Sequence, residues 1–136
     1  MTILRYIPTL ILPIGIYAII AFPAGAHTDE HLNSQLFAIT MASGDVWRMT
    51  LGAALLCLAI VCQMIEVIRS ASPRKAALGE NMIGVVLWII SLILFLLVRG
   101  FGTAEFFLLL LLLLSDYLTD AVIMVFTSRR TIDINR

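Results

Sequence analysis

Long runs of apolar residues dominate the chain, and short polar segments separate them. Four runs each hold about the 17 to 25 residues that an α-helix needs to cross the hydrocarbon core of a bilayer. These runs are Ile3 to Phe22, Val46 to Ile68, Met82 to Val98 and Phe106 to Phe126. The pattern predicts an all-α, polytopic membrane protein in which residues 1–136 form a single transmembrane domain. The expected helices cover residues 3–22, 46–68, 73–98 and 104–127.

Residues with special backbone preferences mark the ends of these runs. Pro23 should end the first run, because proline lacks an N–H and its ring clashes with the preceding turn. Asp45 is a candidate N-cap for the second helix. Gly100 and Gly102 should end the third helix, and Thr103 is a candidate N-cap for the fourth.

Two other prolines have local consequences. Ser72 followed by Pro73 predicts a turn that leads into the third helix. Pro13 predicts a kink at mid-depth in the first helix, which would free the carbonyl of Thr9 as a hydrogen-bond acceptor.

The segment between the first two runs has a weaker helical pattern. Thr28 is a candidate cap, and Leu32, Leu36 and Ile39 would share one side of a helix. These spacings predict a short helix over residues 28–41 that lies along the outer membrane interface.

The basic residues are unevenly distributed between the two sides of a four-helix topology. If both termini are cytoplasmic, two basic residues, Arg48 and Arg99, face outward. The other seven then lie inside, namely Arg5, Arg69, Arg74, Lys75, Arg129, Arg130 and Arg136. Because loops rich in lysine and arginine stay on the cytoplasmic side, both ends of the chain and its one basic loop are expected there.

Composition supports a lipid-embedded chain and removes one class of function. Of 136 residues, 61% are hydrophobic and 13% are charged, against roughly 45–50% and about 25% in ordinary soluble domains. The mean hydropathy is +1.03. Nine basic residues balance nine acidic ones, so no excess of charge points to a nucleic-acid partner. Membrane lipids are the expected surroundings.

An alternative interpretation shortens the mature chain. Arg5, the first apolar run and the small residues Ala24, Gly25 and Ala26 resemble a signal peptide, which would leave three helices after cleavage before His27. Against this, the apolar run is longer than the usual 7 to 15 residues, so four helices are the preferred prediction.

Asp116 is the strongest candidate for a functional residue. It lies ten residues from each end of the fourth apolar run, which is about 15 Å from either surface at 1.5 Å per residue. Asp120 follows one turn later on the same face. Inserting a carboxylate at such depth costs at least about 2.5 kcal/mol, so Asp116 should face protein or water.

Small and polar residues on the second and third helices can surround these acids. The stripe on the second helix consists of Gly52, Leu56, Ala59, Gln63 and Glu66. The stripe on the third helix consists of Asn81, Gly84, Trp88, Ser91 and Phe95. By residue count Ser91 should be level with Asp116, and Gln63 and Glu66 should lie nearer the depth of Asp120. We therefore expect an intramembrane polar site at Asp116, Asp120, Ser91, Gln63 and Glu66.

No lysine, arginine or histidine lies at the middle of any of the four runs. Three outcomes follow for Asp116. It is neutral and hydrogen-bonded to Ser91 or a free carbonyl, it binds a proton or cation in a wet cavity, or a second chain supplies a base.

A metal motif in the loop after the first helix is a weak candidate. His27, Glu30 and His31 match the H-x-x-E-H pattern, in which two histidines bind zinc and a glutamate acts as base. Such a site needs a third ligand and a substrate cleft from a folded soluble domain. A solvated acidic helix start is the preferred interpretation, and no cofactor is expected.

Three segments carry a resemblance, namely SGDVWRMTLG, EFFLLLLLLLSDYLTD and SRRTIDI within residues 43–134. The pattern is similar to that of small four-helix inner-membrane proteins of proteobacteria. The resemblance implies a bacterial inner membrane and brings no activity with it. In size the chain also resembles the small multidrug transporters, but their essential glutamate lies in the first helix, where this chain has no acid.

Three functions remain open at this point. The leading hypothesis is a small non-catalytic membrane subunit that packs against a larger membrane complex or against copies of itself, since the acid is unpaired and no catalytic set accompanies it. The alternative is a small oligomeric proton- or cation-coupled transporter or channel that uses Asp116 with Asp120 and Glu66. The third is a lipid-acting membrane enzyme, for which His27 and the outer acids are the available acid-base groups.

Overall fold

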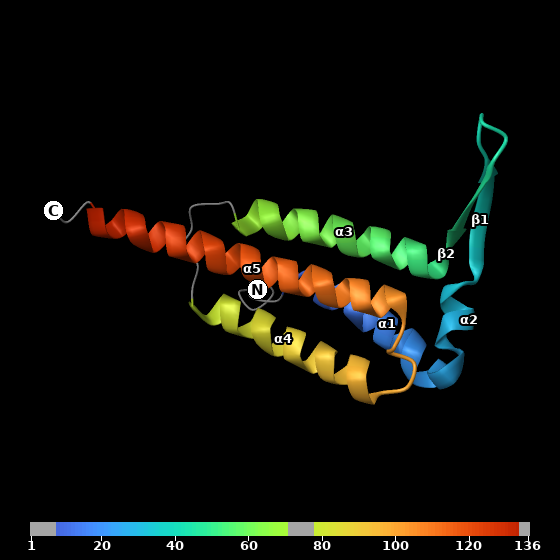
Figure 1. Cartoon of the computed structure of the whole chain (residues 1–136), viewed down its shortest axis with the longest axis horizontal. Coiled ribbons are helices and arrows are strands. Elements are labelled where there is room, and N and C mark those ends of the chain that lie inside the picture. The colour runs from blue at the N-terminus through green and yellow to red at the C-terminus, as the bar shows by residue number, and fades with distance from the viewer. Residues whose placement is uncertain (1–7, 71–77, 134–136) are drawn as a thin grey trace, which may run out of the picture.

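Four long helices run side by side in the computed structural model, which describes residues 8–70 and 78–133 (Figure 1). They are α1 (Ile11–Ala24), α3 (Leu51–Ser70), α4 (Leu78–Leu97) and α5 (Ala104–Asp133). Among the described residues, three helical segments are long and apolar enough to cross a membrane: Ile11–Leu32, Leu51–Arg69 and Ala104–Ile123. The described apolar part of α4, Ile83–Leu97, is shorter. The chain is therefore mostly helical and compatible with a multi-pass membrane protein.

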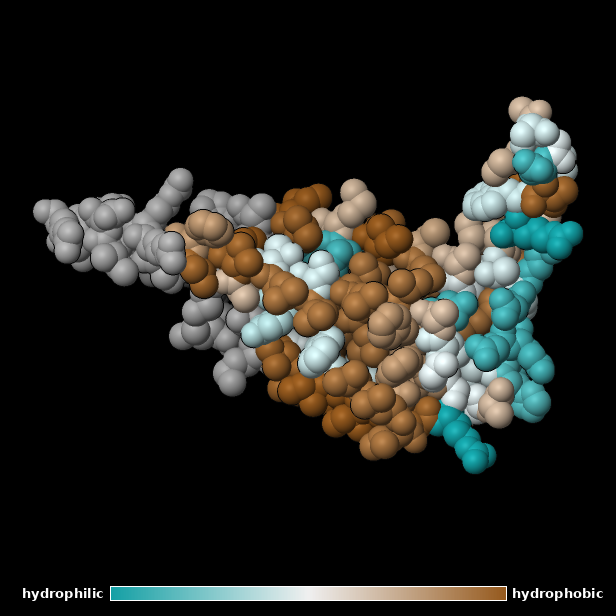
Figure 2. Space-filling view, viewed as in Figure 1, coloured by the Kyte–Doolittle hydropathy of each residue, from teal (hydrophilic) through white to brown (hydrophobic). Residues whose placement is uncertain are grey.

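Helix α5 is at the centre of the arrangement. It packs against α3 on one side and α4 on the other, and α1 contacts both α3 and α5 (Figure 1). Helices α3 and α5 run in one direction, and α1 and α4 run in the opposite one. The visible surface over the helices is largely hydrophobic, whereas the end that carries α2 is hydrophilic (Figure 2). This distribution is typical of helices in lipid with a polar end in water.

The two ends of the bundle differ in structure. At one end, called here the hairpin end, lie α2 (Thr28–Leu32), the strands β1 (Gln35–Thr40) and β2 (Val46–Thr50), and the turn between α4 and α5. The opposite end, called the tail end, holds the last turns of α3 and α5 and the start of α4, and Thr9, just before α1, contacts Glu66 about one turn from the end of α3.

The predicted interfacial helix over residues 28–41 is wrong beyond Leu32. After the 3₁₀ turn η2 (Gly25–His27), α2 has five residues, and β1 and β2 then form an antiparallel hairpin. Residues 41–45 make its turn, in which Gly44 has φ 90° and the Met41 N–H donates to the Asp45 carbonyl at 2.8 Å. The predicted cap is also wrong, because the Thr28 hydroxyl donates back to the Gly25 carbonyl at 2.7 Å. The fold is therefore not purely helical.

The first helix begins later than the apolar run suggests. It starts at Ile11, so Pro13 lies in the first turn, where its missing N–H costs no helical hydrogen bond. The predicted kink is therefore absent, and the Thr9 carbonyl accepts from the Leu12 N–H at 3.2 Å. The helix continues one residue past Pro23 and ends before Gly25, whose φ is 53°.

The other helix boundaries follow local capping chemistry. Helix α3 starts at Leu51 rather than at residue 46, because Asp45 lies in the hairpin turn, and Thr50 instead accepts from the Ala53 N–H at 3.2 Å. The predicted cap at Thr103 is confirmed, since its hydroxyl accepts from the Phe106 N–H at 3.2 Å. Helix α5 extends to Asp133, past the predicted end at residue 127.

Some expectations lie outside the described residues. These are the start of the first helix at residues 3–7, the turn at Ser72 and Pro73, and the basic residues Arg5, Arg74, Lys75 and Arg136. The side chains of Asn81, Arg129 and Arg130 are likewise not described.

Candidate intramembrane polar site

A constant register between α3 and α5 positions the polar residues of the two helices. At the hairpin end, a Cβ added to Gly52 would lie 3.0 Å from Cγ of Glu105. Farther along, the Gln63 amide reaches Asp116, a separation of 53 positions, as for Gly52 and Glu105. Because both helices run in the same direction, this shared offset means that they stay aligned over three turns. The small residue Gly52 allows their close approach.

Gln63 and Asp116 form the central pair of the site. The Gln63 Nε2 group donates to Oδ1 of Asp116 at 3.3 Å. Asp116 is 6% exposed, so its carboxyl is inside the bundle and away from the lipid. The other polar atom of the amide, Oε1 of Gln63, is buried and has no hydrogen-bond partner in the described part of the chain. The pair therefore joins two helices and keeps one spare acceptor.

Glu66 forms a second polar centre one turn nearer the tail end. Its Oε2 accepts from the Thr9 N–H at 3.1 Å and from the Thr9 hydroxyl at 2.7 Å, and Arg69 donates to it at 3.3 Å. The Thr9 hydroxyl also lies 3.0 Å from the Cys62 carbonyl, a second acceptor for the same proton. These contacts join the start of α1 to α3.

The charges of the two centres interact. Asp120, Glu66 and Arg69 all act electrostatically on the Asp116 carboxyl. Glu66 and Arg69 form an ion pair at 3.3 Å, and Arg69 is the positively charged group among the described residues that acts on the Asp116 carboxyl. Thr9 and Arg69 complete a site that the apolar pattern alone did not reveal. The signal for Arg69 was its spacing of three residues from Glu66.

Ser91 is not part of this site. Phe95 packs against Phe106 and Phe107 at ring-centroid distances of 6.5 and 5.8 Å, which sets the level of α4 against α5. Along the helix axes, Ser91 lies about 6 Å from Phe95 and Asp116 about 15 Å from Phe106, both in the direction of the tail end. The expectation that Ser91 is level with Asp116 is therefore wrong. Helices α4 and α5 are joined by a tight turn, so residues equally far from that turn are level, and Ser91 is nearer to the turn than Asp116 is. Ser91 is 1% exposed, and its hydroxyl has no partner among the described residues.

The hairpin end is closed by a dense set of contacts, called here the Tyr17 clamp. The Tyr17 hydroxyl donates to the Gly100 carbonyl at 2.8 Å and is hydrogen-bonded to Thr103. Its ring packs against Phe101 and Phe106 at centroid distances of 5.5 and 4.7 Å. Tyr17, Phe101 and Phe106 are all fully buried. The clamp ties α1 to the turn before α5, and sequence patterns did not single it out.

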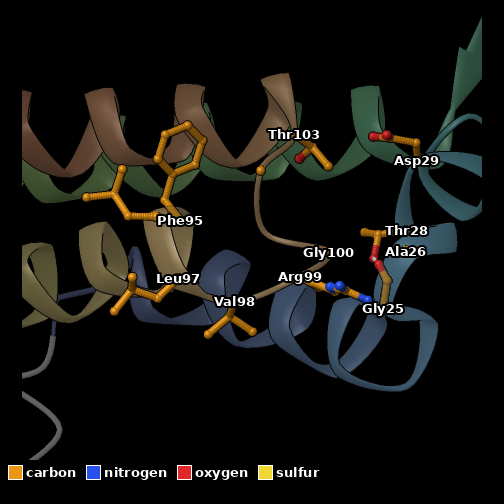
Figure 3. A pocket seen from close by; sticks show the side chains of 12 residues that line it. Gly25, Ala26, Thr28, Asp29, Phe95, Leu97, Val98, Arg99, Gly100 and Thr103 are labelled. Atoms are coloured by element: carbon orange, nitrogen blue, oxygen red, sulfur yellow. Dashed lines mark hydrogen bonds between the residues drawn. The ribbon is translucent and has the colours of Figure 1, made fainter.

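A cavity of about 310 Å³ lies beside the clamp (Figure 3). Gly25, Thr28 and Asp29 line one side, and Phe95 to Gly100 line the other. Arg99 is at its rim and forms no ion pair with Glu105 or any other described residue, whereas Glu105 packs over Gly52. The cavity is at the opposite end of the bundle from Glu66.

The histidines of the H-x-x-E-H pattern are exposed at the hairpin end. His27 pairs with Glu30, with Nδ1 and Oε1 3.4 Å apart and the side chains 71% and 79% exposed. His31 is also exposed, at the end of the five-residue α2. Over residues 8–70 and 78–133, no three His, Cys, Asp or Glu side chains are placed together as metal ligands. Within the part of the chain that the structure describes, His27 and His31 therefore have no third ligand of the kind that the pattern requires.

Comparison with known proteins adds no relative. No protein-family model, curated protein or solved structure matches the chain. The resemblance to small inner-membrane proteins of proteobacteria stays a prediction, and the function must be argued from the geometry.

Proposed function

We propose that this chain is a small non-catalytic membrane subunit that packs through its helices against a larger membrane complex or against copies of itself. The main support for the proposal is that polar side chains in the bundle form hydrogen bonds between different helices or segments. Tyr17 bonds to Thr103, Gln63 to Asp116 and Thr9 to Glu66, so each contact joins two different parts of the helical bundle. Hydrogen bonds of this kind hold transmembrane helices together where lipid offers no partner.

The apolar surface of the helices supports a partner. Only 22% to 28% of each of the three spanning segments is buried inside the chain. The large apolar side chains that stay exposed on these segments, among them Ile19, Ile68 and Leu118, must contact lipid tails or the helices of another protein. A small chain with this much free helical surface suits a subunit role.

The proposed setting is a bacterial inner membrane with four crossings and both termini in the cytoplasm. Helix α4 has 20 residues, about 30 Å at 1.5 Å per residue, and it packs along α5, which supports a fourth crossing. In a four-crossing topology the sequence puts seven of its nine basic residues on the same side as both termini, which supports the orientation.

The experiment is purification of the tagged full-length chain in a mild detergent, followed by native electrophoresis and quantitative mass spectrometry. We expect either a companion protein at a fixed ratio or a discrete oligomer of the chain itself. A harsher detergent is the control, because it should release the monomer if the contacts are between helices. A monomer without companion in the mild detergent would contradict the proposal.

A second function is favoured by one specific feature of the site. Oε1 of Gln63 is a buried acceptor without a described partner beside Asp116, and the charges of Glu66 and Asp120 act on the same carboxyl. Spare oxygen ligands in a membrane are what a proton- or cation-coupled transporter needs. Such a protein would work as an oligomer, with Asp116 as its ion-binding acid.

The two functions differ in the expected behaviour of Asp116→Asn. In a transporter, this change abolishes proton or cation flux in liposomes while the oligomer persists, because the amide keeps the shape but cannot carry the charge. In a structural subunit, the wild-type chain gives no flux above that of empty liposomes. Flux that is equal in the wild type and the variant would remove the transporter hypothesis.

A further inference from the structure

The β1–β2 hairpin has one face made only of apolar side chains. In an antiparallel pair, directly opposed residues project to the same side of the sheet. Phe37 pairs with Met49, and Ile39 pairs with Trp47, so these four share a face. The Phe37 and Trp47 rings touch at a centroid distance of 5.8 Å, which agrees with this assignment. The hairpin is therefore amphipathic.

The opposite face of the hairpin has a different character. The pairs there are Ala38 with Arg48 and Thr40 with Val46. A charge and a hydroxyl on this side are suited to water or lipid headgroups. The polarity of the hairpin thus changes across the thickness of one sheet.

The apolar face is uncovered within the chain. Phe37 is 45% exposed, Ile39 51% and Trp47 43%. An isolated two-stranded hairpin is at best marginally stable in water, so a free face of this kind needs a cover. No described element of the chain packs over it, since both strands are exposed along nearly their whole length.

The position of the hairpin indicates what covers it. Strand β2 ends at Thr50 and α3 begins at Leu51, so no linker separates the hairpin from an apolar helix that can span the membrane. The strands of the hairpin run transverse to the long axis of the helical bundle (Figure 1). If the bundle spans the membrane, the hairpin is therefore parallel to the membrane surface. Tryptophan at this level is typical of the membrane interface.

We infer that the hairpin is an interfacial anchor whose apolar face, formed by Phe37, Ile39, Trp47 and Met49, lies in the boundary between lipid headgroups and acyl chains. The inference depends on the membrane location and not on the choice between a subunit and a transporter. The hairpin fixes the depth of α3 in the bilayer, because the two elements are continuous. Its unpaired strand edges are solvated at the headgroup level.

The experiment uses fluorescence quenching, since the chain has two tryptophans, Trp47 and Trp88. The full-length Trp88→Phe protein, which keeps Trp47, is reconstituted in phosphatidylcholine vesicles with bromine atoms near either end of the acyl chains. We expect loss of Trp47 fluorescence with the shallow bromine and little quenching by aqueous iodide. The difference between wild type and Trp47→Phe gives the same signal without a change at Trp88.

A matched control moves the tryptophan to the other face of the same strand. In the Trp47→Phe, Trp88→Phe protein, Val46→Trp should be quenched by iodide and weakly by bromine. Equal exposure at positions 46 and 47 would overturn the inference. So would iodide quenching of Trp47, which would mean a face left open for a protein partner, or protection from both quenchers, which would mean a second copy as the cover.

The Trp47→Phe protein keeps Trp88 and reports on the helices. Trp88 lies about 13 Å along α4 from its end at Leu97, so the deep bromine should quench it. If Trp88 is quenched and Trp47 is not, the anchor is wrong while the membrane location stands. If neither is quenched, both are wrong, whereas the subunit role is decided separately by the purification experiment.

Discussion

The two ends of the helical bundle are held together in different ways. The Tyr17 clamp at the hairpin end combines fully buried aromatic rings with hydrogen bonds to Thr103 and Gly100. The Gln63–Asp116 pair farther along α5 is a single hydrogen bond, and it leaves Oε1 of Gln63 without a described partner. Close packing of buried rings allows only one arrangement of the side chains. A polar group with a single hydrogen bond can exchange its partner for another polar group. The clamp therefore fixes the hairpin end of the bundle, and the Gln63–Asp116 pair is the candidate functional site.

The largest expected effect is at the clamp. Gly100 has φ 89°, and a Cβ there would lie 2.6 Å from the Gly25 carbonyl oxygen and 2.6 Å from the Thr28 hydroxyl. Gly100→Ala combines a left-handed backbone with a clash against main chain, so we expect a loss of about 2 to 4 kcal/mol in the free energy of unfolding. The measurement is unfolding by SDS in mixed micelles, followed by circular dichroism.

Gly102→Ala is the matched control for this substitution. A Cβ at Gly102 meets nothing within 4 Å, and its φ is not in the left-handed region. Equal losses for the two variants would show that the clamp does not depend on close approach at Gly100.

A smaller loss is expected from the hydroxyl of the clamp. Tyr17→Phe keeps the ring but removes the group that bonds to Thr103 and Gly100, which should cost about 1 to 2 kcal/mol. Tyr117→Phe is the control, because Tyr117 is half-buried and makes no described hydrogen bond. If both variants unfold like the wild type, packing alone accounts for the clamp.

The junction between α1 and α3 should respond to Thr9→Val. The change removes the hydroxyl that donates to Glu66 at 2.7 Å, for an expected loss of about 1 kcal/mol. Thr119 provides the comparison, since its hydroxyl bonds to the Ser115 carbonyl within the same helix. A loss for Thr119→Val as large as for Thr9→Val would contradict a role in joining helices.

The long helices were predictable because lipid imposes a length and an apolar composition on any spanning element. Residues 51–68, 83–97 and 106–126 are helical as expected. The β hairpin was missed because Leu32, Leu36 and Ile39 also fit a helical spacing, and a short apolar segment fits two periods. The alternation of Phe37 with Ile39 and of Trp47 with Met49 was the signal for strands.

The candidate site was partly predictable, for a similar reason. The stripe with Gly52, Ala59, Gln63 and Glu66 does face the neighbouring helices, as its spacing indicated. The partner of Asp116 was not predictable, because the level of one helix against another depends on turn geometry that residue counts do not contain. Ser91 was expected beside Asp116, and Gln63 is there instead.

The hydrogen bond between Gln63 and Asp116 holds α3 and α5 together, and the proposed structural role depends on it. A double-mutant cycle tests it, with Asp116→Leu, Gln63→Leu and the double variant unfolded by SDS in mixed micelles. We expect a coupling of about 0.6 kcal/mol and no more than about 1.7 kcal/mol, the mean and the maximum found for hydrogen bonds between membrane helices. If the effects of the two single substitutions are additive, the coupling is zero. Asp116 would then not be held by Gln63, which would contradict the structural role.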